Sequence, residues 1–486
     1  MAMTTNGLSS KVIRSFLRRV KSSSPSNTTT TPRFRLAQRT TINTTTVFPS
    51  SPPPPPPTTA VADDPRDSIF DFEDTKGLFS SVTTGKLLRS AANLNLAAVE
   101  PVVDLGMWVM RSRLMQVGIF REIVLGTIKH TSYEHFVAGA DMVETGRTVK
   151  RLWESGLRGM LDYGLEHAVD NESCDKNAQE FIETVESTQV LPPSSVSFVV
   201  VKITAICPVS LLKRVSDLLR WEYKNSSSMN LPWKLKTLPI FSESSPFYHT
   251  LEKPAPLTPE EESDLELAHQ RLVNICNKSI ECNVPVVIDA EDTSIQPGID
   301  YFTYSAAVMY NKGEKPLIFG TIQAYLKDAG ERLFETKRAA DKMGLPVGFK
   351  LVRGAYLWSE SQLANSIGVE SPIHNSIDET HKCYNGCASF MLDEVSNGPG
   401  GLILATHNLD SGFGVSKYLP FGPVDQIMPY LLRRAEENKG LLSSSNLDRQ
   451  LMMKELKRRM KAYVGQGLMD TESRLKSETG SIVKLN

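Results

Sequence analysis

The sequence lacks several features that mark specialised classes of protein. It has no run of 18 apolar residues, so no membrane-spanning helix is expected. Only 6 of its 486 residues are cysteine, too few for a disulfide scaffold, and a reducing compartment is the better expectation. Lys and Arg number 54 against 55 Asp and Glu, which argues against a protein that coats nucleic acid. A hydrophobic content of 40% indicates a globular chain.

Acidic residues are absent from positions 1–62, which carry eight basic residues and many Ser and Thr. Val12, Phe16 and Val20 recur at helical spacing beside several of these basic residues. An amphipathic, Arg-rich and acid-poor start is typical of an organelle transit peptide. The early amphipathic turn favours mitochondria, although chloroplast peptides overlap in composition. A disordered basic tail is the alternative interpretation.

The rest of the chain divides by pattern into three parts. Apolar residues three or four apart predict a helical arm over 63–156, after a disordered transit peptide over 1–62. Residues 157–465 alternate short apolar runs with longer helical stretches, and 466–486 form a C-terminal tail. Alternation of this kind predicts a parallel sheet covered by helices.

Seven short apolar runs are candidate strands in the region 157–465. They are near-continuous in hydrophobic residues, as strands covered on both faces should be. No Gly-x-Gly-x-x-Gly follows a strand, which disfavours a dinucleotide-binding sheet. The prediction is an α/β fold of the TIM-like (β/α)₈ barrel type, with strands at Gly159 to Leu165, Phe198 to Thr204, Val284 to Ala290, Leu317 to Gln323, Gly348 to Arg353, Leu402 to Thr406 and Lys417 to Phe421.

Polar residues recur at the ends of these runs, where barrel enzymes carry their chemistry. One lysine or histidine at a strand end is often a satisfied core group, but six successive strands offering such groups point to a site. Arg433 and Arg434 could bind one anion or form a solvated helix face. Cys383 and Cys387 have no second ligand pair at a suitable spacing, so no metal site is predicted.

Several motifs together resemble the flavin-dependent proline dehydrogenases, and in particular the plant mitochondrial members. The resemblance runs from about 76 to 465. Its strongest parts are Val-Val-Val-Lys202-Ile-Thr, Ile-Asp289-Ala-Glu291-Asp292-Thr, Lys350-Leu-Val-Arg-Gly-Ala-Tyr356, Ala-Thr406-His407-Asn408, and Tyr418-x-Pro-Phe-Gly422 with Tyr430-Leu-Leu-Arg433-Arg434.

The resemblance implies an activity, a cofactor and partners. It implies a (β/α)₈ barrel with non-covalent FAD that oxidises L-proline to Δ1-pyrroline-5-carboxylate, the first step of proline catabolism to glutamate. Electrons would pass to a quinone, with peripheral association at the matrix side of the inner mitochondrial membrane. No nucleic-acid partner is implied.

The resemblance also implies roles for individual residues. Lys202, Arg433 and Arg434 would bind the proline carboxylate, Tyr356 and Tyr418 would wall the ring, and Asp289 would lie beside them. Flavin contacts would come from Gln323, Lys350, Val352, Gly354, Ala355, Thr406, His407, Asn408 and Glu437.

A segment of the barrel is missing between Asn408 and Lys417. Only eight residues separate them, whereas a helix, a strand and a second helix need about 30. The barrel is therefore expected to be incomplete, without its seventh strand and the flanking helices. The strands beside the gap should pair directly or leave open edges, exposing Leu402 and Leu404 and lowering solubility. A catalytically impaired homologue or truncated isoform with a binding or regulatory role is thus the alternative to a working enzyme.

Overall fold

Two compact units make up the chain. The computed structural model describes residues 2–4, 74–80, 82–97, 99–225, 230–406, 414–440 and 449–463. The barrel unit comprises Met1–Asp63, Gly146–Asp162 and His167–Tyr418. The helical unit comprises Asp64–Thr145, Tyr163–Glu166 and Leu419–Asn486.

The seven predicted strands all form, with ends that differ from the prediction by no more than three residues. Each pair of neighbours from β2 to β7 is parallel, and the sheet closes in the order β1-β7-β6-β5-β4-β3-β2-β8. The parallel barrel fold is thereby confirmed. The strands are β2 (Arg158–Tyr163), β3 (Val196–Val201), β4 (Val286–Ile288), β5 (Ile318–Gln323), β6 (Gly348–Val352), β7 (Gly401–Ala405) and β8 (Gly414–Phe421).

A three-residue strand, β1 (Ala2–Thr4), lies where the sequence predicts a gap. Its backbone pairs antiparallel with β7, through Met3 and Leu404, and with β8, through Met3 and Val415. β7 and β8 therefore neither pair directly nor leave open edges, contrary to both expected arrangements. A short antiparallel strand can take the position because it satisfies the same row of backbone groups.

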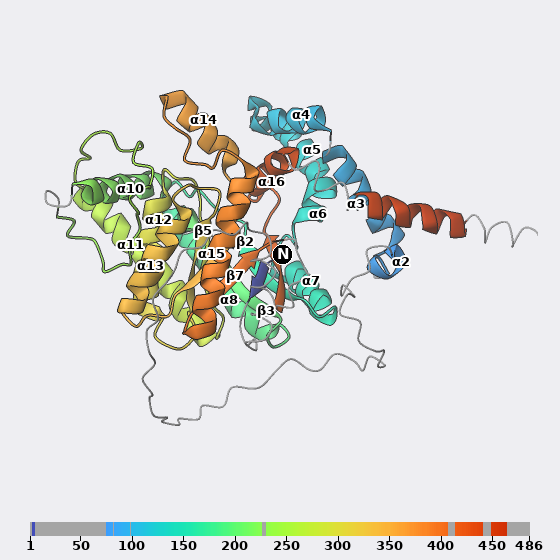
Figure 1. Cartoon of the computed structure of the whole chain (residues 1–486). Helices are drawn as coiled ribbons and strands as arrows, with labels where there is room; N and C mark the ends of the chain where they lie inside the picture. Colours follow the sequence, from blue (N-terminus) through green and yellow to red (C-terminus); the bar gives the residue numbers. More distant parts are fainter. Residues whose placement is uncertain are drawn as a thin grey trace, which may run out of the picture. The chain divides into compact units, whose positions relative to one another are not determined.

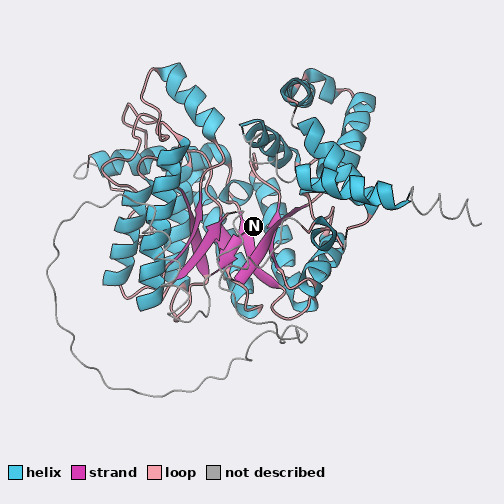
Figure 2. Ribbon diagram, turned by 45° about the vertical axis from the view of Figure 1, so that its right-hand side comes forward, coloured by secondary structure: helices cyan, strands magenta, loops and turns pink. Residues whose placement is uncertain are grey.

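Helices lie outside the strands of the barrel unit, as Figure 2 shows with the strands in magenta and the helices in cyan. Most strands are followed by at least one long helix, which is the repeating unit of a parallel barrel. These helices (labelled in Figure 1) are α7 (Met142–Glu154, beginning in the helical unit), α8 (Asn171–Ser187), α9 (Ile203–Ile206), α10 (Val209–Lys224), α11 (Pro259–Glu281), α12 (Gln296–Tyr310), α13 (Ala329–Lys342), α14 (Leu357–Ile367) and α15 (Ile377–Asn397), with a short 3₁₀ turn η3 at Thr188–Val190.

Local sequence sets the ends of these helices. Thr258 caps α11 by accepting a hydrogen bond from the Glu261 amide, and the Glu261 carboxylate accepts one from the Thr258 amide. This is the reciprocal capping box that the sequence predicts. Gly344, with φ of +64°, follows the end of α13, a backbone conformation that glycine adopts without strain.

The inside of the barrel is apolar at one level. Met160, Phe198, Val200, Val287, Phe319 and Ile403 form a buried cluster there. The Phe319 ring lies so close to Gly348 and Gly401 that a Cβ on either would fall within 2.5 Å of it. The two glycines therefore make room for one aromatic ring in the centre of the barrel.

Leu402 and Leu404 are buried, with exposed fractions of 1% and 4%, so the expectation that they face water is wrong. α15 lies between β6 and β7 in the chain and packs against β7. Tyr384 of α15 donates a hydrogen bond to the Ala405 carbonyl of β7 at 3.2 Å. A helix that precedes β7 thus covers its outer face without the missing segment. These two side chains therefore give no reason to expect low solubility.

The helical unit has its own small cores. Leu87 and Ala91 pack with Leu456, which lies in a helix over 449–463. Tyr133, Ile427 and Leu431 form a second buried cluster. None of the helices in the described parts of either unit is long and apolar enough to cross a membrane. The unit contains α2 (Thr75–Leu78), α3 (Thr84–Ala97), α4 (Glu100–Arg111), η1 (Arg113–Gln116), α5 (Gly118–Ile128), η2 (Lys129–Tyr133), α6 (Glu134–Phe136) and α16 (Met428–Gly440).

Candidate functional site

Side-chain alternation along the strands places charged groups above the apolar cluster inside the barrel. Successive residues of a strand point to opposite faces. Val200 belongs to the inner cluster, so Lys202, two residues on, also points inward. Met160 and Val287 also belong to the inner cluster, so Asp162 and Asp289, each two residues further on, point inward as well. The carboxyl ends of parallel strands meet at one end of the barrel, which brings these side chains together.

Lys202 lies between two carboxylates. Its Nζ atom is 2.8 Å from Oδ1 of Asp162 and 3.4 Å from Oδ2 of Asp289. Only 3% of Lys202 and none of Asp162 is exposed. A buried ammonium is costly unless it meets an anion, and here it meets two.

Asp289 is contacted by residues of β6 and β8 and by Lys202, which follows β3. It receives hydrogen bonds from Lys350 at Oδ1 and from the Tyr418 hydroxyl at Oδ2, the latter at 3.0 Å. Burial on its own would raise the pKa of Asp289, but the positive charges of Lys350 and Lys202 outweigh burial and lower the pKa to about 2. Asp289 is therefore a carboxylate at neutral pH.

Gln323 joins two neighbouring loops at the same end of the barrel. Its amide nitrogen donates to the Glu291 carbonyl at 2.7 Å, and its amide oxygen accepts from the Ala355 backbone at 3.3 Å. Gly354 has φ of +140°, and a Cβ there would come within 2.2 Å of the Tyr325 ring. Only glycine fits the backbone at that position.

The remaining predicted residues lie at strand ends or outside the described part. Val352 and Thr406, both half-buried, lie at the ends of β6 and β7, and Tyr356 precedes α14. His407 and Asn408 lie outside the described residues, as does the side chain of Glu437. The structure thus brings together Lys202, Asp289, Lys350 and Tyr418.

Arg433 and Arg434 belong to the helical unit, on α16. Arg433 forms a two-pronged ion pair with Glu166, in which Nη2 lies 2.7 Å from Oε2. A guanidinium and a carboxylate match in this way because both are planar and forked. The Arg434 guanidinium lies 5.6 Å from the centre of the Tyr430 ring. Both arginines are half-buried, which argues against a fully solvated helix face.

Asp162 and Glu291 are buried acidic residues with no predicted role. Asp162 could have been found from strand parity, because it stands two residues after Met160 as Lys202 stands two after Val200. Glu291, also fully buried, accepts a hydrogen bond from Thr204 at 2.7 Å and lies 3.5 Å from His167 Nε2. Glu291 lies in the loop after β4, where side chains do not alternate regularly, so the sequence does not indicate that it is buried.

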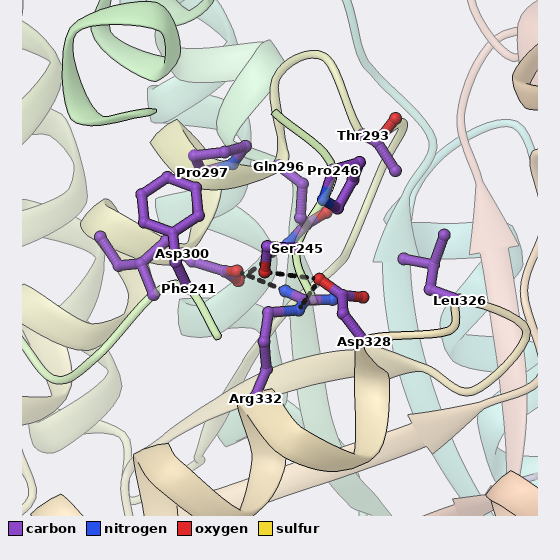
Figure 3. A pocket seen from close by; sticks show the side chains of 11 residues that line it. Phe241, Ser245, Pro246, Thr293, Gln296, Pro297, Asp300, Leu326, Asp328 and Arg332 are labelled. Carbon is purple, nitrogen blue, oxygen red and sulfur yellow. Dashed lines mark hydrogen bonds and ion pairs between the residues drawn. The ribbon is translucent and has the colours of Figure 1, made fainter. Parts of the chain in front are cut away.

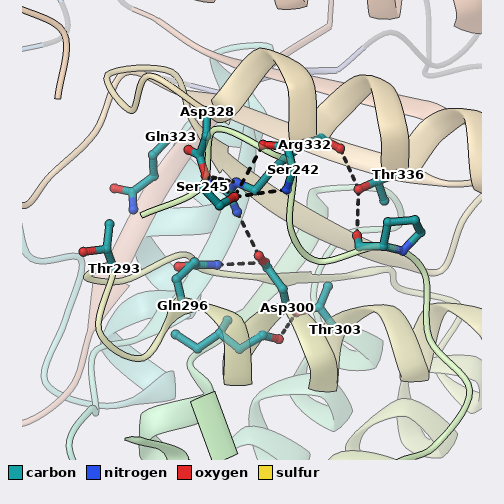
Figure 4. A network of polar contacts seen from close by, with 12 residues as sticks. Ser242, Ser245, Thr293, Gln296, Asp300, Thr303, Gln323, Asp328, Arg332 and Thr336 are labelled. Carbon is teal, nitrogen blue, oxygen red and sulfur yellow. Dashed lines mark hydrogen bonds and ion pairs between the residues drawn. The ribbon is translucent and has the colours of Figure 1, made fainter. Parts of the chain in front are cut away.

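A second buried polar cluster supports the loop after β4 from outside the barrel (Figure 4). Gln296 accepts a hydrogen bond from the Glu291 amide at 2.8 Å and donates one to Asp300 at 2.8 Å. Asp300 pairs with Arg332 at 2.9 Å. Burial raises the pKa of Asp300 to about 6, although the Arg332 charge opposes this rise.

The pocket beside this second cluster is not the candidate active site. Phe241, Pro246 and Leu326 line it together with Asp328 and Arg332 (Figure 3). Its volume of about 20 Å³ is room for about one water molecule. Among the described residues, no group of three His, Cys, Asp or Glu side chains could hold a metal ion.

The donor set at the strand ends fits a flavin. Flavin rings present carbonyl oxygens and ring nitrogens, which need hydrogen-bond donors. Lys350 is buried, and its bond to Asp289 uses one of the three N–H groups of its ammonium. Gln323 and the backbone at Gly354 and Ala355 lie at the ends of neighbouring strands. These groups are of the kind that such a cofactor would contact.

The fold and the site together define a class of protein. It is a barrel of parallel strands that carries charged residues at the carboxyl ends of those strands. The family model for proline dehydrogenase matches residues 145–413 and 410–447. The chain belongs to the proline dehydrogenase family, a family of oxidoreductases.

Relatives at about half identity support this assignment. The chain is 52% identical to proline dehydrogenase 1, mitochondrial, of Arabidopsis thaliana, over 81% of this chain and 87% of that protein. It is 50% identical to proline dehydrogenase 2, mitochondrial, of the same plant, over 82% of this chain and 93% of the relative. Human hydroxyproline dehydrogenase is 29% identical over 79% of this chain and 92% of its own length.

A solved structure shares the fold. Proline utilization A (PutA) from Bdellovibrio bacteriovorus, inactivated by N-propargylglycine, matches with a TM-score of 0.50 and 17% identity. The match covers 80% of this chain and 41% of that chain. At this identity the likeness concerns the fold alone.

The family match is interrupted where the sequence predicts a missing segment. Its two parts meet at 410–413, between β7 and β8. The alignment to the second Arabidopsis relative is 444 positions long and holds 82% of the 486 residues of this chain, or about 399. About 45 positions of that relative, the difference, have no counterpart here. The interruption of the family match supports an incomplete barrel, and the number of unmatched positions is large enough for the missing helix, strand and helix.

Proposed function

We propose that this chain derives from an FAD-dependent proline dehydrogenase, which oxidises L-proline to Δ1-pyrroline-5-carboxylate and passes the electrons to a quinone. The observation that carries the proposal is the family match over 145–447 together with the buried Lys202, Asp289, Lys350 and Tyr418 at the strand ends. The reaction removes two electrons and two protons from proline and is the first step of proline catabolism to glutamate.

In this proposal the residues of the chain bind and orient the substrate. Lys202, Arg433 and Arg434 hold the proline carboxylate through charge-assisted hydrogen bonds. Tyr356 and Tyr418 wall the ring, and Asp289 fixes the Tyr418 hydroxyl. Holding the ring in one orientation lowers the entropy cost of the hydride transfer.

FAD, when bound, supplies the oxidising power of the reaction. Six of the residues that would hold it lie in or just after β5, β6 and β7, namely Gln323, Lys350, Val352, Gly354, Ala355 and Thr406, and Glu437 belongs to α16. His407 and Asn408, which follow Thr406 in the sequence, complete the proposed set. Lys350 and Gln323 would donate hydrogen bonds to the ring system.

The proposed location is the mitochondrion, at the matrix side of the inner membrane. The Arabidopsis relatives are named as mitochondrial proteins, and the acid-free basic stretch over 1–62 suits a transit peptide. A quinone acceptor would require the protein to associate with that membrane peripherally.

A second candidate function is that of a catalytically impaired homologue with a binding or regulatory role. The interruption of the family match at 410–413 favours it, because the missing segment would belong to the same barrel. Two of the proposed flavin contacts, His407 and Asn408, directly precede the interruption.

One anaerobic experiment separates the two candidates. The purified 486-residue chain is loaded with FAD and mixed with L-proline, with D-proline as the matched control. Loss of the oxidised flavin absorbance with L-proline alone supports the enzyme. A chain that binds FAD but keeps its absorbance with both compounds supports the impaired homologue. Production of Δ1-pyrroline-5-carboxylate, trapped with an aromatic aldehyde, identifies the product.

A further inference from the structure

Asp162 is the partner of Lys202 that neither the sequence motifs nor the family match assigns. It lies in β2, and Lys202 directly follows the neighbouring strand β3. The two side chains are almost wholly buried, at 0% and 4% exposure, and Nζ lies 2.8 Å from Oδ1. Parallel pairing of Asp162 with Val200 fixes the height of the carboxylate relative to Lys202.

The two carboxylates around Lys202 do not have the same surroundings. Asp289 also accepts from Lys350 and from Tyr418, so its charge is shared among three donors. Among the residues that the structure describes, Lys202 is the hydrogen-bond partner of Asp162, and Oδ2 of Asp162 has none. Among the described residues, Asp162 thus pairs with Lys202, whereas Asp289 contacts Lys202, Lys350 and Tyr418.

Among the described residues, two carboxylates and one further ammonium group lie around Lys202. Asp162 from β2 and Asp289 after β4 are negative, and Lys350 from β6 is positive, with the Tyr418 hydroxyl beside them. Without Asp162, the Lys202 ammonium would lose its 2.8 Å partner and would share the Asp289 carboxylate with Lys350 in a buried place. Burial and a like charge both favour the neutral form of a lysine.

We propose that Asp162 is a positioning residue, which holds the Lys202 ammonium in one place and keeps it charged for binding a substrate carboxylate. The binding part of this inference rests on the proposed function of Lys202. The link between Asp162 and Lys202 rests on the geometry alone. The contrasting interpretation is that Asp162 only stabilises the barrel.

The test measures the protonation of Lys202 directly and needs neither flavin nor proline. The full chain is labelled briefly with acetic anhydride at a series of pH values, and acetylation of Lys202 is quantified by mass spectrometry against surface lysines. In the Asp162→Asn chain, the midpoint for Lys202 should fall by about one pH unit or more. The matched control is Asp300→Asn, which removes an equally buried carboxylate from Arg332 and should leave the Lys202 midpoint unchanged.

The outcomes distinguish the inference from its contrast. An Asp162→Asn chain that loses stability while the Lys202 midpoint stays in place overturns the inference. If that variant does not fold, Asp162→Ser is used. If neither variant folds, the acetylation midpoint of Lys202 in the unaltered chain is the deciding measurement. Its Lys202 midpoint should then lie at or above that of surface lysines, and a midpoint well below them overturns the inference.

A binding measurement adds the second half of the test. In an FAD-loaded protein that binds L-proline, Asp162→Asn should weaken binding about tenfold above the shifted midpoint and less below it. In a Lys202→Met background the same substitution should change binding less than about twofold. Equal weakening in both backgrounds contradicts action through Lys202. Absence of proline binding in the unaltered chain counts against the proposed function and leaves the labelling result to decide the Asp162 link.

Discussion

The hydroxyl of Tyr418 donates a hydrogen bond to Oδ2 of Asp289 at 3.0 Å, joining β8 to the end of β4 across 129 residues of sequence. Lys350 lies against both, with its Nζ atom 5.4 Å from the centre of the Tyr418 ring. β8 begins directly after the interrupted segment, so the interruption lies close in sequence to a residue of the charged cluster. The proposed site therefore depends on how β8 is held.

Replacing Tyr418 with Phe removes this hydrogen bond and keeps the ring. The free energy of unfolding should fall by about 1 kcal/mol, the usual worth of such a bond. Tyr384→Phe is the matched control, because its hydroxyl also bonds within the barrel unit, to the Ala405 carbonyl. Both variants should lose similar stability in urea unfolding. In a chain whose missing segment is restored, only Tyr418→Phe should slow flavin reduction by L-proline, by about fivefold. An equal effect of both variants would count against a site role.

Acid should weaken the barrel through Asp289. Its pKa is lowered in the folded chain to about 2, so its stabilisation is present above its ordinary pKa of 3.8 and lost as pH falls towards 2. The loss should amount to about 2 kcal/mol in the free energy of unfolding. An Asp289→Asn chain should show a smaller fall between pH 4 and pH 2.

Asp300→Asn is the control for this pH series. The pKa of Asp300 is raised to about 6, so this side chain already carries its proton in the folded chain below pH 4. The Asp300→Asn chain should therefore keep the full fall between pH 4 and pH 2. A fall of the same size in Asp289→Asn would contradict the charge arrangement described for Lys202, Lys350 and Asp289.

The sequence predicted the barrel because covered strands leave a strong signal. β3 and β5 are near-continuous apolar runs, buried along almost their whole length. β8 begins at Gly414, three residues before its predicted start. Gly414 is exposed, Val415 is half-buried and Ser416 is buried but polar, so these three residues show no apolar run in the sequence. The charged cluster was found in part, since Lys202 and Asp289 stand at strand ends. Asp162 lies within β2, so only the alternation of side chains along that strand indicates its inward position.

The arrangement around the missing segment could not be read from the sequence. β1 lies in a basic, Ser- and Thr-rich stretch with no strand pattern, and its pairing with β7 and β8 is a long-range contact. The burial of Leu402 and Leu404 depends on α15, which precedes β7 in the chain. The residues around the missing segment thus do not indicate that β1, far away in the sequence, lies between β7 and β8.

Arg433→Met and Arg434→Met should each raise the KM for L-proline strongly. Removing one partner of a buried, charge-assisted contact costs about 2 to 5 kcal/mol. The variants are made in a chain whose missing segment is restored from the Arabidopsis relative, and steady-state kinetics give KM. Flavin content should change little, which separates substrate binding from folding. An unchanged KM would falsify the carboxylate-binding role.

Residues 1–62 should direct a fused fluorescent protein to mitochondria. The acid-free, Arg-rich composition is the reason. The matched control replaces Arg14, Arg18 and Arg19 with Glu, which should leave the reporter in the cytosol. Plastid or cytosolic fluorescence of the unaltered fusion contradicts the prediction. Cleavage before about residue 62 would also remove β1 from the mature chain.

The flavin content of two purified chains tests the central claim most directly. One is the 486-residue chain, and the other carries the segment of the Arabidopsis relative inserted between Asn408 and Lys417. Both are purified with added FAD, and bound flavin is measured by absorbance per mole of protein. The restored chain should hold close to one flavin and oxidise L-proline, while the shorter chain should hold little. A shorter chain that is fully loaded and active would contradict the need for the missing segment, and a restored chain without flavin would contradict the proposed flavin site.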